Sequence, residues 1–196
     1  MNRLKLMRFY LVGPMDNDRE GGRQWREMIS DWLLERSAIP LNPYEKPLRN
    51  AETAAEDDNN FFARQKAKAE GDWRTVRELM KPVVHTDLRM VDHCDALIVH
   101  LDLDKKPCGT WDEIVTAANQ NKPVLIHAVQ GIKELPDWLF GRLHYDFFFN
   151  DWYEMKGYLD YINTEPDETL HVNEPSSLKW KFFDYEPLVK EALSNV

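Results

Sequence analysis

Predominantly apolar runs alternate along the chain with segments whose apolar residues recur at helical spacing. Residues 4–12, 96–99 and 123–129 are short runs rich in aliphatic side chains, which is typical of strands buried on both faces. Helical patterns cover 73–93 and 110–120, and the clearest helical stripe consists of Trp25, Met28, Ile29, Trp32 and Leu33. Strands that alternate with helices predict an α/β fold with a parallel sheet covered on both faces.

Weaker signals extend this pattern. Two prolines, Pro40 and Pro43, bound a short apolar run, so we expect an edge strand over 39–42. Pro82 marks a break or a new first turn inside the helical pattern of 73–93. Beyond the last strong strand, the sequence predicts a short helix at 136–143, an aromatic strand at 147–149 and a helix with Trp152, Met155, Leu159 and Ile162 on one side.

Two segments depart from the alternation. From Tyr44 to Asp72 the sequence is polar, with an acidic run followed by a basic one. A solvated helix pair with faces of opposite charge explains these runs more simply than a phosphate or nucleic-acid patch. At 196 residues a single domain is the usual size. We therefore expect one α/β domain over 1–164 with an insertion at about 45–72, and a C-terminal extension over 165–196.

Composition narrows the class of partner. The chain has 25 Lys and Arg against 34 Asp and Glu, a formal charge of -9, which argues against binding to nucleic acid. Its apolar runs are too short to span a bilayer and its first residues lack the apolar core of a signal peptide, so we expect a soluble, intracellular protein. Cys94 and Cys108 are then expected to be free thiols. The six histidines show no metal-binding spacing, so no metal is expected.

Three polar segments follow strands or open helices, and they are the candidate site. The first runs from Gly13, Pro14 and Met15 to Gly21, Gly22 and Arg23; the second contains Asp102; the third contains Gly109, Thr110 and Glu113. In a parallel sheet, ligands bind beyond the carboxyl ends of the strands, so these segments are expected to converge.

Glu113 has two interpretations. Thr110 and Glu113 form the T-x-x-E pattern of a capping box, in which the two side chains satisfy backbone amides at the start of a helix. A carboxylate in the first turn of a helix is also held in its ionised form by the helix dipole, as a nucleophile requires. The spacing fits both roles.

Four motifs in order resemble the nucleoside 2-deoxyribosyltransferase family, including its relatives that hydrolyse deoxynucleoside monophosphates. They are FYLVGP, TDLRMVDHCDALIV, GTWDEIVTA and NKPV, and together the resemblance covers about residues 6–130. It implies a flavodoxin-like or Rossmann-like doubly wound parallel sheet, a cytoplasmic homo-oligomer, and no cofactor. The implied substrates are a 2′-deoxynucleoside or deoxynucleotide and a free base.

The resemblance also assigns catalytic roles by position. Glu113 matches the nucleophile that attacks the anomeric carbon, Tyr10 the tyrosine that holds this nucleophile, and Asp87 the aspartate close to base and sugar. From the residues alone, Tyr10 is equally an ordinary strand aromatic, and Asp87 a helix cap or surface residue.

One position departs from the transferases. They carry a second aspartate six residues before the nucleophile, where this chain has Pro107; Asp102 or Asp104 would replace it only if their loop folds back. That absence, together with a Gly21-Gly22-Arg23 segment resembling a phosphate-binding loop, is closer to the monophosphate hydrolases, although Gly-Gly is equally a plain helix entry. A non-catalytic nucleotide-binding module and a NAD-directed glycosidase are the remaining alternatives.

Overall fold

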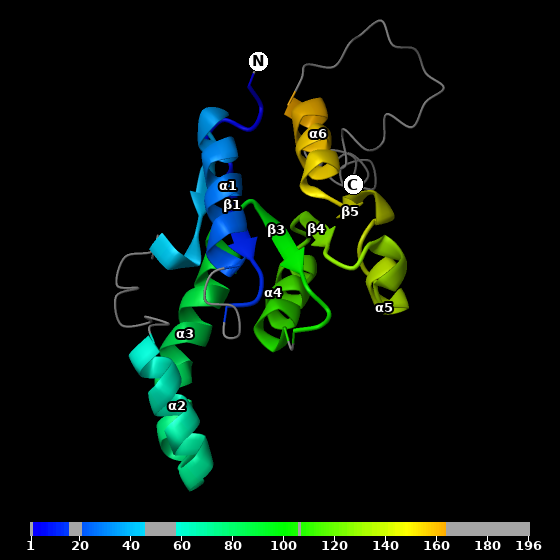
Figure 1. Cartoon of the computed structure of the whole chain (residues 1–196). Coiled ribbons are helices and arrows are strands. Elements are labelled where there is room, and N and C mark those ends of the chain that lie inside the picture. The colour runs from blue at the N-terminus through cyan, green and yellow to red at the C-terminus, as the bar shows by residue number, and fades with distance from the viewer. Residues whose placement is uncertain (1, 16–20, 46–57, 106, 164–196) are drawn as a thin grey trace, which may run out of the picture.

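The centre of the molecule is one sheet of parallel strands. The computed structural model describes residues 2–15, 21–45, 58–105 and 107–163, so the expected C-terminal extension and residues 46–57 of the insertion lie outside the described residues. Within these ranges the sheet has five strands in the order β2-β1-β3-β4-β5 (Figure 1). The strands are β1 (Arg8–Val12), β2 (Ile39–Leu41), β3 (Ala96–Leu101), β4 (Val124–Ala128) and β5 (Phe148–Phe149).

The strand order matches the flavodoxin-like arrangement. The chain builds β2 on one side of β1 and then crosses to place β3 on the other, with Tyr10 beside Leu97 and Leu11 beside Ile98. The point at which the winding direction reverses therefore lies between β1 and β3, and in open α/β sheets ligands bind at that point. The doubly wound parallel sheet expected from the sequence is confirmed.

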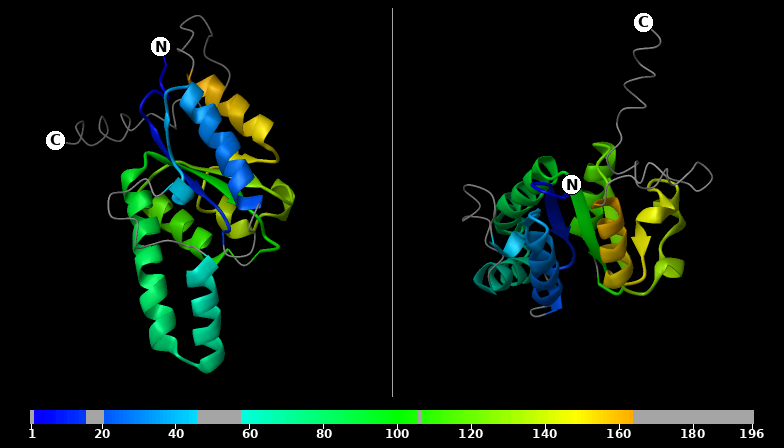
Figure 2. Two further views of the ribbon diagram at one scale, coloured as in Figure 1. Left: turned by 60° about the vertical axis from the view of Figure 1, so that its left-hand side comes forward. Right: turned by 90° about the horizontal axis from the view of Figure 1, so that it is seen from above.

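Helices cover both faces of the sheet. Alternate residues of β3 point to opposite sides: Leu97 belongs to the apolar cluster with α3 (Trp73–His93) and α4 (Cys108–Asn119), whereas Ile98 belongs to the cluster with α1 (Gly21–Glu35) and α6 (Trp152–Asn163). α1 and α6 lie side by side (Figure 2), where the Arg36 Nε atom donates to Asp160 Oδ1 at 2.7 Å. None of the helices in the described ranges is long and apolar enough to cross a membrane.

The remaining elements are short. They are η1 (Pro43–Glu45), η3 (Ile132–Glu134), α5 (Asp137–Phe140) and η4 (Tyr145–Phe147). Two predicted boundaries shift. The first strand begins at Arg8 rather than residue 4, because Leu6 has a φ of 66° and turns the chain before the strand. α3 continues through Pro82 without ending, although a proline there removes one backbone donor.

A helical hairpin projects beyond the carboxyl edge of the sheet. α3 spans 21 residues, about 31 Å, whereas the six residues of β3 span about 20 Å, so the N-terminal part of α3 extends past the strand that follows it. α2 (Asp58–Glu70) runs beside this part of α3 (Figure 2). Of the helix pair expected in the insertion, α2 is thus one member, and residues 46–57 lie outside the described residues.

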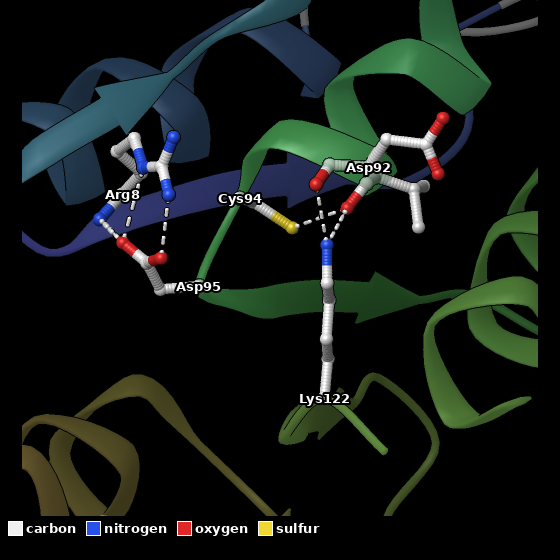
Figure 3. A network of polar contacts seen from close by, with 6 residues as sticks. Arg8, Asp92, Cys94, Asp95 and Lys122 are labelled. Atoms are coloured by element: carbon white, nitrogen blue, oxygen red, sulfur yellow. Dashed lines mark hydrogen bonds and ion pairs between the residues drawn. The ribbon is translucent and has the colours of Figure 1, made fainter. Parts of the chain in front are cut away.

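Polar contacts at the opposite edge fasten the other end of α3. Lys122 Nζ donates to the carbonyl of Asp92 at 2.7 Å, and Cys94 Sγ lies 3.1 Å from the carbonyl of Val91 (Figure 3). Arg8 Nη2 pairs with Asp95 Oδ1 at 2.7 Å, which joins β1 to the segment that enters β3. These contacts fix the C-terminal end of α3 to β1 and to the segment that precedes β4. The pocket-facing residues of α3 therefore have a defined position against the sheet.

Candidate active site

A pocket of about 310 Å³ opens at the carboxyl ends of β1 and β3, between α3 and α4. Its volume is at the lower end of the range for small-molecule sites. The β1 end and its loop, α3 and the start of α4 contribute most of its wall. The lining residues are Tyr10, Gly13, Pro14, Met15, Arg26, Pro43, Met80, Val83, Val84, Asp87, Lys105, Pro107, Cys108, Gly109, Thr110, Asp112 and Glu113.

Tyr10 and Glu113 meet in the wall of this pocket. The Tyr10 hydroxyl donates a hydrogen bond to Glu113 Oε1. Both side chains are buried, Tyr10 to 2% and Glu113 to 7% exposure. A buried carboxylate is tolerated only when its oxygens are hydrogen-bonded, so this contact helps to keep Glu113 in place at the pocket surface.

Burial and nearby acids hold Tyr10 in its neutral form. Removal from water raises the pKa of Tyr10 well above its usual value, and the negative charges of Glu113 and Asp87 raise it further, while Arg26 acts in the opposite direction. At neutral pH the phenol therefore keeps its proton and acts as the donor.

The capping interpretation of Glu113 is wrong. α4 begins at Cys108, its N-cap residue is Pro107, and no side chain caps it. Thr110 is therefore inside the helix rather than at its N-cap, and Glu113 lies in the second turn rather than in the expected first turn. Glu113 lies on the buried side of α4, and its carboxylate accepts a hydrogen bond from Tyr10 on the sheet. Its role is therefore in this contact and not in capping the helix.

α3 supplies the opposite wall. Met80, Val83, Val84 and Asp87 follow the i, i+3, i+4, i+7 spacing that places side chains on one helix face, and all four line the pocket. Asp87 is not a helix cap, because Asp72 caps α3 and accepts from the Thr75 amide at 3.1 Å. The wall thus combines an apolar strip with one carboxylate.

The structure separates the predicted binding residues into two groups. Gly13, Pro14, Met15, Gly109 and Thr110 line the pocket together with the three catalytic candidates. A second group lies outside its lining.

Asp102 belongs to this second group. Asp102 Oδ1 accepts from Gln130 Nε2 at 2.7 Å, and Asp104 accepts from the same nitrogen at 3.0 Å, so the loop after β3 leans toward the end of β4. It does not fold back to replace the aspartate that is absent at Pro107, and Asp102 is not part of the pocket that the sequence assigned to it.

Gly22 and Arg23 also lie beside the pocket rather than in its lining. α1 begins at Gly21, and the Arg23 guanidinium lies 4.2 Å from the centre of the Tyr44 ring. A Cβ at Gly22 would lie 3.1 Å from Arg26 Nη1 and 3.1 Å from the Pro14 carbonyl, so close packing explains this glycine.

Sequence reasoning missed several lining residues. Arg26 is a charged residue inside the apolar stripe of α1, and that anomaly is the signal that marks it. Met80, Val83 and Val84 have the helical spacing of ordinary core residues. That spacing does not show that α3 extends past the sheet, where these side chains line a pocket. Lys105 and Asp112 are charged surface residues by pattern alone.

A second polar cluster lies on the other face of the sheet. The Nδ1 atoms of His100 and His127 are 2.9 Å apart, both rings pack against Trp152, and the His100 ring also stacks on Trp25. Burial lowers the pKa of His127, which favours the neutral ring. Among the described residues, no group of three or more His, Cys, Asp or Glu is arranged to hold a metal.

Comparison with known proteins gives fold-level similarity. No family model matches the chain, and no curated protein sequence matches it significantly. A solved 2-deoxyribosyltransferase from Bacillus psychrosaccharolyticus aligns with a TM-score of 0.51 and 18% identity, over 76% of this chain and 90% of that one. A conserved protein from Enterococcus faecalis V583 aligns at 0.43 and 17% identity, over 81% and 88%, which is too weak to support an argument. The chain therefore has the fold of a 2-deoxyribosyltransferase, the family that its sequence motifs resemble.

Proposed function

We propose that this protein cleaves the N-glycosidic bond of a 2′-deoxynucleoside or deoxynucleotide and passes the sugar to another base or to water. The observation that carries the proposal is the buried Glu113 carboxylate, oriented by the Tyr10 hydroxyl in the wall of a pocket at the sheet's reversal point. Burying a carboxylate lowers the stability of the fold, so a buried acid in a pocket wall favours a chemical role for it. The shared fold with a 2-deoxyribosyltransferase supports the same activity.

Glu113 acts as the nucleophile in the first half-reaction. One of its carboxylate oxygens attacks C1′ of the sugar, a C–O ester bond forms, and the C1′–N bond breaks with its electron pair on the base. Tyr10 donates to Oε1 and remains neutral, so it orients the carboxylate without competing for the sugar. The absence of a 2′-hydroxyl lowers the cost of positive charge on the sugar, which favours deoxy substrates.

Asp87 is the candidate acid for the departing base. It lies on the α3 wall of the same pocket, and protonating a leaving nitrogen contributes roughly 10² to 10⁴-fold in rate. In the second half-reaction a nitrogen of another base, or water, attacks C1′, its proton passes to Asp87, and the ester bond to Glu113 breaks. That step returns the carboxylate to its starting form.

Hydrolysis is the second candidate outcome, and one observation favours it. Pro107 lines the pocket where the resembling transferases carry an aspartate that contacts the base, and Asp102 and Asp104 are held by Gln130 instead. A site with fewer contacts for an incoming base gives water an advantage in the second half-reaction.

The decisive experiment separates catalysis, transfer and hydrolysis. The purified chain is incubated with each of the four common 2′-deoxynucleosides and their 5′-monophosphates, with and without a second free base, and products are resolved by chromatography. We expect free base from at least one substrate. A new nucleoside indicates transfer, free sugar indicates hydrolysis, and no product from any substrate would support a non-catalytic binding module. In a parallel incubation with NAD, release of nicotinamide would support the NAD-directed glycosidase.

A matched pair of variants assigns the nucleophile. Glu113→Gln should abolish turnover, whereas Glu134→Gln makes the same chemical change at an exposed position outside the pocket lining and should leave it intact. A 2′-fluoroarabino nucleoside slows release of the sugar ester, so mass spectrometry should find the added sugar on the peptide that contains Glu113. Full turnover by Glu113→Gln, or an adduct on another residue, would refute the assignment.

A further inference from the structure

A fully buried arginine underlies one side of the pocket. Arg26, on α1, is 0% exposed. Its three guanidinium nitrogens donate to three main-chain carbonyls: Nε to Leu11 at 3.1 Å, Nη1 to Gly22 at 2.8 Å and Nη2 to Gly13 at 2.7 Å. The fork of one side chain thus joins the end of β1, the loop that leaves it and the first turn of α1.

The position of Arg26 is energetically demanding. Burying a guanidinium costs several kcal/mol unless its N–H groups are hydrogen-bonded. A lysine in its place would lack the planar set of donors that makes these three hydrogen bonds at once. The guanidinium also lies 4.5 Å from the centre of the Trp25 ring and 5.5 Å from that of Tyr44. A residue held this tightly fixes the backbone that it binds.

That backbone is part of the pocket wall. Gly13, whose carbonyl accepts from Arg26, lines the pocket together with Pro14 and Met15, and Arg26 itself reaches the lining. Gly22 leaves the space that this arrangement needs, because a Cβ there would lie 3.1 Å from Arg26 Nη1 and 3.1 Å from the Pro14 carbonyl. The loop therefore has its present shape because Arg26 holds it.

Arg26 also brings positive charge to an acidic pocket. The charged and titratable groups of the lining are Tyr10 from β1, Arg26 from α1, Asp87 from α3, Lys105 from the loop before α4, and Cys108, Asp112 and Glu113 from α4. The charge of Arg26 reaches Tyr10, whose pKa it lowers against the effects of burial, Glu113 and Asp87. The pair that contains the proposed nucleophile is thus within the field of a buried cation.

We propose that Arg26 is the positioning residue of the proposed reaction: its fork sets the distance between the Gly13–Met15 wall and Glu113, and its charge favours the ionised carboxylate. The inference rests on the proposed glycosidic cleavage. Binding a sugar between this wall and Glu113 requires a fixed separation, and a misplacement of about 1 Å costs on the order of 10²-fold in rate.

Two substitutions separate the fork from the charge. Arg26→Lys keeps the charge and loses the fork, so kcat/KM for the best substrate should fall by roughly 10 to 100-fold with the pH profile unchanged. Arg26→Met loses both, so the acid limb of the pH profile should also move to higher pH, because a carboxylate without a nearby cation ionises less readily.

The control lies just after the C-terminal end of the same helix. Arg36 also packs over a tryptophan, 3.7 Å from the centre of the Trp32 ring, and donates to the Trp32 carbonyl at 3.1 Å, but it pairs with Asp160 away from the pocket. Arg36→Lys should change thermal stability alone and leave kcat/KM and the pH profile as in the wild type.

A third variant covers the case in which the Arg26 variants do not fold. Gly22→Ala presses a methyl group against Arg26 Nη1 and the Pro14 carbonyl without changing any charge, so it should lower kcat/KM at an unchanged pH profile. Gly157→Ala, on α6, where a Cβ meets nothing within 4 Å, is its control and should be active.

The outcomes distinguish the two proposals. If the wild type cleaves its substrate and both Arg26→Lys and Gly22→Ala match it in kcat/KM, the inference about Arg26 is wrong and the proposed function stands. A wild type that cleaves none of the deoxynucleosides or deoxynucleotides overturns both.

Discussion

Tyr10 and Glu113 are 103 residues apart in the chain and share a hydrogen bond in the wall of one pocket. The parallel pairing of β1 with β3 creates this meeting, because Tyr10 lies beside Leu97 in the sheet and α4 follows β3 directly. The phenol is kept neutral by burial and by two acids, so a donor faces an acceptor at physiological pH.

Removing the Tyr10 hydroxyl tests this relationship. Tyr10→Phe keeps the ring and leaves the Glu113 carboxylate with one partner fewer, so the free energy of unfolding should fall by about 1.5 to 3 kcal/mol, the scale of a hydrogen bond to a charged group. We expect kcat/KM to fall as well, because the proposed nucleophile, Glu113, is less well oriented. Urea unfolding and steady-state kinetics provide the two values. In the Glu113→Gln background the same substitution should cost much less stability, and equal costs would show that the two residues are not coupled.

Asp87 is tested through the leaving group. Asp87→Asn should slow release of ordinary bases by roughly 10² to 10⁴-fold and should have a much smaller effect on a base that departs readily as an anion. Rates across a series of bases of different acidity measure this difference. The control is Asp92→Asn on the same helix, since Asp92 is exposed and accepts from Gln120 at 2.7 Å. A loss that is equal for all bases would argue for a binding role instead.

Gly13 and Gly109 line the same pocket but differ in the space around them. A Cβ at Gly13 would lie 3.0 Å from the His100 carbonyl and 3.1 Å from Trp25 Cζ2, whereas at Gly109 it would meet nothing within 4 Å. Gly13→Ala should therefore cost about 1 to 3 kcal/mol of stability through overpacking. Gly109→Ala, in the first turn of α4, should be neutral or slightly stabilising. Thermal unfolding of both variants would refute this reasoning if the order were reversed.

The raised pKa of Cys94 predicts that the free energy of unfolding falls at alkaline pH. Burial raises the pKa of Cys94 from 9.0 to about 11. The folded state then favours the protonated thiol, so its contribution is complete below pH 9 and is lost as the pH rises toward 11, by up to about 1.4 kcal/mol per pH unit. Unfolding free energies at pH 8 and pH 10 should differ more in the wild type than in Cys94→Ala. The same difference in both proteins would mean that other groups cause the alkaline loss.

Sequence patterns predicted the sheet better than the site. The apolar runs and helical stripes indicated α/β layers, but periodicity does not give strand order, and the flavodoxin-like order was expected from the resemblance alone. Pro40 and Pro43 correctly indicated an edge strand. The homo-oligomeric state and cytoplasmic location implied by the resemblance stay predictions.

The errors at the site came from contacts that are distant in sequence. The T-x-x-E spacing fitted a capping box, but Glu113 is turned to the sheet by Tyr10 and the helix begins earlier, at Cys108. Asp102 follows a strand as a site residue should, yet it accepts a hydrogen bond from Gln130, just after β4, and lies outside the pocket lining. Local spacing contains no information about either partner.

The central place of β3 in the sheet has a consequence for refolding. Because Tyr10 and Glu113 meet only after β3 has paired with β1, an intermediate that forms the β3–β4 half alone lacks the proposed catalytic pair. We therefore expect secondary structure to return before enzymatic activity when the denatured chain is diluted from urea. The return of turnover would then show when the contact between Tyr10 and Glu113 forms, which requires β1 to pair with β3.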